Sequence, residues 1–169
     1  MYFVPFYLED QNGEPGKLRQ IMVLQDGLDL PLDTYVFLEN YCINKNCDCR
    51  KVMINAISKS NQKILGTFTY GWEKLGYYTK WLYGDKELAI ELKGPALELG
   101  GIQSEYAEIL LGKFKGLVED DKYRGRLKKH YHLFKKRLEE IKDEDLCLCG
   151  SSKQWKNCCA RLCEMIDQF

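Results

Sequence analysis

The sequence has no net charge and no long apolar run, and each absence excludes a class of function. Lys and Arg together number 25, Asp and Glu also number 25, and the formal net charge of the 169 residues is zero. The overall charge therefore does not attract the chain to nucleic acid or to a membrane surface, and any such attraction must come from a local patch. No apolar stretch approaches the roughly 20 residues of a membrane-spanning helix. We therefore expect no membrane partner.

Recognisable catalytic motifs are also missing. The chain contains no glycine-rich phosphate loop, no Gly-x-Ser-x-Gly and no His-Glu-x-x-His. Its two histidines are His130 and His132, which point to different faces of a helix and do not both bind one metal easily. The sequence places no general acid or base. We therefore expect a binding protein and not an enzyme.

The N-terminal residues 1–6 have neither a basic start nor a sustained apolar run. They do not resemble a secretory signal peptide, and we expect a cytoplasmic protein whose thiols stay reduced. Clustered reduced thiols are more often metal ligands than disulfide partners. The cysteines are therefore the residues most informative about function.

Four of the eight cysteines lie close together near the end of the chain, at Cys147, Cys149, Cys158 and Cys159. Four thiolates are the ligand set of a tetrahedral structural zinc site. The intervening Gly-Ser-Ser at 150–152 favours a tight turn that brings the two pairs together. The spacing predicts one zinc ion bound by these four residues.

This segment resembles the SEC-C motif, a zinc knuckle written Cys-x-Cys, eight residues, then Cys-Cys or Cys-His. The residues that match include Cys149-Gly150-Ser151, Lys153, Trp155 and Lys156. Ser152 replaces a glycine that is common in the motif, so a positive φ there would carry modest strain. In the motor of the bacterial preprotein translocase this motif binds zinc and docks a chaperone. The resemblance therefore implies zinc and a macromolecular partner.

A second group of cysteines, Cys42, Cys47 and Cys49, lies between two expected strands. Three thiolates in one hairpin loop suggest a second zinc site that lacks its fourth ligand. The candidates for that ligand are His130, His132, Cys163 and water. The alternative is a set of reduced thiols packed as small hydrophobic side chains.

The first hundred residues, 1–100, predict an antiparallel, β-rich region. β-Branched and aromatic residues predict strands at 18–24, 33–42, 51–58, 64–72, 77–83 and 87–92, of which the last also suits a helix. The aromatic residues between Phe68 and Tyr83 are typical of the core of a half-buried sheet, although exposed rings would instead form a platform for nucleic-acid bases.

Residues 101–143 change to helical spacing. One helix begins near Ser104, the next begins at Asp120 or Asp121, and together they predict a helical hairpin packed on the sheet. The fold class is therefore α+β. Residues 144–169, which we call the knuckle, follow as a small zinc-binding appendage.

Charge on the second helix is segregated, with eight Lys or Arg and no acidic residue from 122 to 137. Such a helix is either a solvated face or a site for phosphates. Our leading hypothesis is a zinc-binding adaptor whose knuckle contacts another protein through Trp155, Lys153 and Lys156. The alternative for Trp155 is packing onto the helix of its own domain. The alternative is a nucleic-acid or ribosome-associated module that uses the basic helix and the knuckle.

Overall fold

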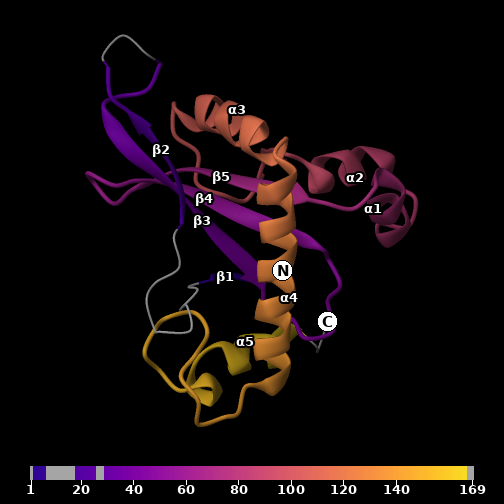
Figure 1. Ribbon diagram of the computed structural model, residues 1–169. Coiled ribbons are helices and arrows are strands. Elements are labelled where there is room, and N and C mark those ends of the chain that lie inside the picture. Colours follow the sequence, from indigo (N-terminus) through magenta and orange to yellow (C-terminus); the bar gives the residue numbers. More distant parts are fainter. Residues whose placement is uncertain (1, 7–17, 26–28, 167–169) are drawn as a thin grey trace.

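A single antiparallel sheet forms the centre of the computed structural model, which describes residues 2–6, 18–25 and 29–166 (Figure 1). The order of its strands is β1-β3-β4-β5-β6, and β2 also pairs with β3. The strands are β1 (Phe3–Pro5), β2 (Arg19–Val23), β3 (Asp33–Cys42), β4 (Lys51–Ser58), β5 (Ile64–Gly71) and β6 (Ala96–Leu97). The expected strands at 18–24, 33–42, 51–58 and 64–72 are therefore confirmed, whereas β1 and β6 were not predicted.

β3 is the longest strand and is paired along both sides. On one side β1 pairs with its Cys42 end and β2 with its Asp33 end, and on the other side β3 pairs with β4. Side chains alternate between the two faces of a strand, and in β4 those of Val52, Ile54 and Ala56 are completely buried. They lie on the face that the helices cover.

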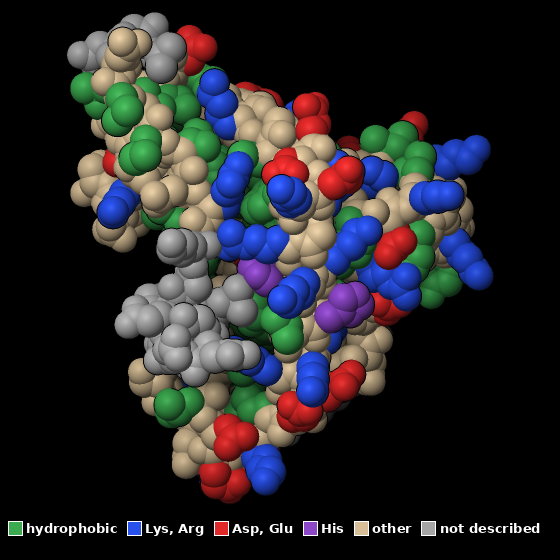
Figure 2. All heavy atoms as spheres, viewed as in Figure 1, with side chains coloured by type: hydrophobic (Ala, Val, Ile, Leu, Met, Phe, Trp, Pro, Cys, Tyr) green, Lys and Arg blue, Asp and Glu red, His purple; other side chains and the backbone are tan. Residues whose placement is uncertain are grey.

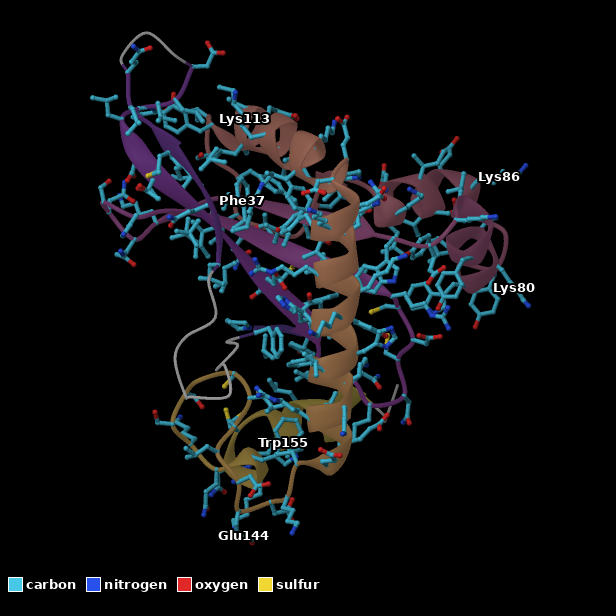
Figure 3. All side chains as sticks on the ribbon, in the orientation of Figure 1. Phe37, Lys80, Lys86, Lys113, Glu144 and Trp155 are labelled. Atoms are coloured by element: carbon cyan, nitrogen blue, oxygen red, sulfur yellow. The ribbon has the colours of Figure 1, made fainter. Side chains whose placement is uncertain are left out.

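Two helices cover this face of the sheet, α3 (Ala107–Val118) against β5 and α4 (Asp121–Glu140) against β4. The Asp120 side chain accepts a hydrogen bond from the Lys122 amide at 2.9 Å and so caps the N-terminus of α4. Phe37, Phe68 and Phe114 meet at the centre of the core, and Figure 3 shows Phe37 between the sheet and the helices. The α+β class is confirmed.

The expected strand at 77–83 is wrong, because most of this segment lies in helix α1 (Leu75–Trp81), and at 87–92 the helical alternative is confirmed by α2 (Lys86–Lys93). Asp85 caps α2 by accepting from the Leu88 amide at 3.0 Å. In α1, burial of Tyr78 overrides the strand preference of the aromatic residues. Its hydroxyl donates to the Arg50 carbonyl at 2.8 Å, which ties α1 to the loop between β3 and β4.

The chain after α4 forms the knuckle, which contains a short 3-10 helix, Trp155–Asn157, and helix α5 (Cys159–Ile166). In Figure 1 the knuckle lies at the lower end of α4, and α5 runs behind that end. Among the helices of the described residues, none has the length and apolar character of a membrane span.

Candidate metal centres

The knuckle begins as a miniature hairpin that holds Cys147 and Cys149. Leu146 pairs with Gln154, the Cys147 amide donates to the Lys153 carbonyl at 2.8 Å, and the Trp155 amide donates to the Asp145 carbonyl at 2.8 Å. The chain reverses with positive φ values of 76° at Gly150 and 58° at Ser152. Ser152 thus adopts the conformation in which the glycine of related motifs is less strained.

The four knuckle sulfurs converge. The Sγ atoms of Cys147, Cys149, Cys158 and Cys159 all lie within 4.8 Å of one another. The Sγ atoms of Cys149 and Cys158 are 3.6 Å apart, close to the edge of about 3.8 Å in a tetrahedron with Zn–S bonds of about 2.3 Å. A disulfide would need about 2.0 Å. The donor set and its spacing therefore fit a tetrahedral metal ion.

The crowding of the knuckle thiols changes their pKa values. Burial alone would raise the pKa of Cys149, but hydrogen bonds from Ser151 and Cys147 lower it to about 7. Burial, together with a hydrogen bond to Cys147, raises the pKa of Cys159. Neighbouring thiols that compete for one negative charge are the arrangement from which a divalent cation displaces protons.

Trp155 packs inward, which agrees with the alternative of packing on its own domain and removes it from the expected contact surface. Its side chain is 4% exposed and belongs to the hydrophobic core, and Figure 3 shows it between the knuckle and the end of α4. Lys153 and Lys156 are exposed as expected. Leu146, which the sequence did not single out, is 69% exposed beside them.

A second cluster lies in the β3–β4 loop, residues 43–50. The Sγ atoms of Cys42, Cys47 and Cys49 lie within 4.8 Å of one another, because Cys42 ends β3 and Cys49 stands just before β4. Cys42 and Cys49 are completely buried, and Cys47 is half-buried. Hydrogen bonds from Cys47 and Cys49 lower the pKa of Cys42 to about 3, whereas the hydrogen bonds of Cys49 with Cys42 and Cys47 raise the pKa of Cys49.

Helices hold this loop from several sides. The hydroxyl of Tyr77 on α1 donates to the Asp48 carbonyl. From α4, Lys135 Nζ donates to the Asn44 carbonyl at 2.6 Å. From α5, Cys163 Sγ donates to the Ile43 carbonyl at 3.2 Å. The loop therefore joins parts of the chain that are distant in sequence.

The structure separates the candidates for a fourth ligand of the loop cluster. His130 Nδ1 is 2.6 Å from Glu39 Oε2, and its ring packs on Phe6. His132 is exposed. Neither ring lies within 4.8 Å of all three sulfurs, and the Cys163 sulfur in its present rotamer does not either. Cys163 contacts the loop beside Cys42.

Glu39 is the centre of a buried polar network that the sequence analysis missed. It is 2% exposed, accepts from the Tyr41 hydroxyl at 2.9 Å, and pairs with His130 and, at 3.7 Å, with Arg126. In the sequence, Glu39 is an acidic residue within a strand of mostly apolar and aromatic residues. That position was the signal that could have indicated a buried carboxylate. The network joins β3 to α4.

The basic residues of α4 are divided between internal contacts and solvent. Figure 2 shows Lys and Arg side chains spaced along the exposed side of α4, with acidic side chains gathered below the lower end of the helix. Arg126 and Arg124 pair with Glu39 and Asp121, respectively. The remaining exposed lysines with no ion-pair partner among the described residues include Lys122, Lys128 and Lys129.

Comparison with known families identifies the knuckle segment. Residues 145–161 match the family model of the SEC-C motif, in agreement with the resemblance of the cysteine spacing. The match covers the four knuckle cysteines and ends before Cys163. Comparisons of the chain with curated proteins and with solved structures give no match.

Proposed function

We propose that this chain is a zinc-binding adaptor: its knuckle holds one zinc ion and contacts another protein. The observation that carries the proposal is the convergence of four cysteine sulfurs within 4.8 Å inside the segment that matches the SEC-C motif. Four thiolates favour zinc and leave no position open for substrate. We therefore propose a binding role and no catalytic one.

Zinc would act here as a structural cross-link. Segments below about 40 residues seldom bury enough apolar surface to fold without a staple. Binding of zinc to such peptides contributes about 10–16 kcal/mol, more than burial of Trp155 alone. The four cysteines would thus fix the miniature hairpin against the start of α5.

The surface that we assign to the partner consists of Leu146, Lys153 and Gln154. These residues are exposed and lie on the two paired strands of the miniature hairpin. A large apolar side chain next to a lysine suits a protein segment that carries an apolar residue beside an acidic one. We leave Lys156 out of this surface, because its ammonium group pairs with Glu144 at 3.3 Å.

Photo-crosslinking in cells tests this surface. A photoreactive residue at position 146 should capture a discrete protein, and Lys153→Glu should reduce that capture at least about tenfold by reversing the charge. Lys113→Glu is the matched control, since Lys113 is also exposed and lies on α3, far from the knuckle (Figure 3). Equal capture by both variants would contradict the proposal.

The alternative function is nucleic-acid or ribosome association through α4, which the exposed Lys122, Lys128 and Lys129 favour. Replacing these three lysines with glutamine should then release copurifying RNA, and binding should fall steeply with salt. The adaptor proposal instead predicts that partner capture survives nuclease treatment and depends on Lys153.

A further inference from the structure

We propose that Cys163 completes a second four-thiolate zinc site with Cys42, Cys47 and Cys49, and that this site fastens α5 to the β3–β4 loop. The three loop sulfurs already lie within 4.8 Å of one another. Structural zinc sites are almost always four-coordinate, so the loop needs one more donor. The inference is independent of whether the knuckle contacts a partner protein.

The position of Cys163 carries the assignment. Its sulfur donates to the carbonyl of Ile43, the residue that follows Cys42, at 3.2 Å. Rotation of a cysteine side chain between staggered rotamers moves its sulfur by about 3 Å, so the thiol can turn from this carbonyl toward the loop sulfurs. His130 is engaged by Glu39, and His132 is exposed.

The surroundings suit a four-thiolate zinc complex. Such a complex carries a net negative charge, and Lys135 holds its ammonium group at the loop through the Asn44 carbonyl at 2.6 Å. Cys42 and Cys49 are completely buried, which shields the metal from water. Binding would replace the S–H bonds of the coordinating thiols with S–Zn bonds and release their protons to solvent.

Helix α5 would then connect the two metal sites. Cys159 belongs to the knuckle cluster, and Cys163 follows it by four residues on the same helix. Residues with this spacing lie on one face of a helix, about 6 Å apart along its axis. One helical turn thus joins the zinc of the knuckle to the zinc of the sheet.

Cadmium replaces zinc in thiolate sites, and its NMR shift reports the number of bound sulfurs, which makes the site testable in the full chain. The ¹¹³Cd-loaded protein should show two resonances, both typical of four thiolates. Cys163→Ser should shift one resonance to a three-thiolate position and leave the other unchanged. Cys47→Ser should affect the same resonance as Cys163→Ser, and an unchanged knuckle resonance together with an unchanged circular dichroism spectrum shows that the variants still fold.

His132→Ala is the matched control and should leave both resonances in place. Native mass spectrometry of the unsubstituted chain should find two zinc ions. A single ion would overturn the second site, and two four-thiolate resonances that persist in Cys163→Ser would overturn the role of Cys163. A three-thiolate resonance in the unsubstituted protein would equally reject Cys163 as the fourth ligand.

Discussion

Ser152 shows how a single residue can depart from the pattern of its motif without removing the site. Its φ of 58° lies in the left-handed region, which glycine adopts with little strain and a residue with a β-carbon does not. None of the four knuckle sulfurs is displaced from the cluster, since all lie within 4.8 Å of one another. The cost of the serine is therefore local to the turn.

Replacing Ser152 with glycine should stabilise the zinc-bound knuckle by up to about 1 kcal/mol, because relief of backbone strain exceeds the added flexibility of glycine. Zinc affinity measured by chelator competition should rise accordingly. Ser151→Gly is the matched control and should lower the affinity, since the Ser151 hydroxyl lies 3.3 Å from Cys158 Sγ. An unchanged affinity in Ser152→Gly would show that the turn carries no strain.

Individual side chains were also harder to place than the motif itself. The spacing of the knuckle cysteines predicted a cluster that the structure brings together. It left open whether Trp155 is buried and did not single out the exposed Leu146, because a segment of this length does not indicate which face meets the core. The Cys163 contact depends on where α5 docks, and no local pattern specifies that position.

At the scale of elements, the attachment of α4 to β3 depends on polar groups as well as on apolar packing. Glu39 on β3 pairs with His130 on α4 at 2.6 Å, and the single proton of the Tyr41 hydroxyl is shared between Glu39 at 2.9 Å and the Leu127 carbonyl at 3.1 Å. Burial and the adjacent Glu39 raise the pKa of Tyr41 well above its usual value. The hydroxyl therefore stays protonated and continues to donate.

Glu39→Ala should lower the free energy of unfolding by about 2–4 kcal/mol, because it leaves buried partners without their acceptor. Urea denaturation followed by tryptophan fluorescence measures the loss. The double variant Glu39→Leu/His130→Leu should recover part of it, since apolar side chains can replace a buried pair at little cost. If the double variant were as unstable as Glu39→Ala, the loss of stability would come from the changed side-chain shape and not from unsatisfied polar groups.

The elements differ in how far the sequence determined them. β3 and β4 have the bounds expected from strand propensity, and α4 begins after the expected cap, Asp120. α1 was mistaken for a strand because its aromatic and β-branched residues favour extended structure in isolation, whereas the segment of α2, 87–92, also suited the helix that the structure has. Tertiary contacts decide otherwise, since Tyr78 is buried where it binds the Arg50 carbonyl.

At the scale of the whole molecule, we expect the hydrophobic core to hold the sheet and a metal ion to fix the knuckle. Phe37, Phe68 and Phe114 form the aromatic part of that core, to which the knuckle contributes Trp155, and the rest of the knuckle would depend on zinc bound by its four cysteines. The expected division at 100/101 and 143/144 stays a prediction.

Removal of metal should therefore loosen the knuckle and leave the sheet folded. Hydrogen exchange in excess chelator should show amides of 145–158 and α5 losing protection by at least about 100-fold, while β3, β4 and β5 keep theirs. Zinc added back should restore protection. Loss of protection in the strands to the same degree would mean that metal holds the entire fold.

The contact between Cys163 and Ile43 also has a consequence for biosynthesis. The two residues are 120 positions apart, and ribosomes add about 5–20 residues per second. The β3–β4 loop is therefore made about 6–24 s before the helix that will contact it. During that interval its three crowded thiols lack the contact with α5, so a reducing environment would be needed to keep them from forming disulfides until α5 has been made.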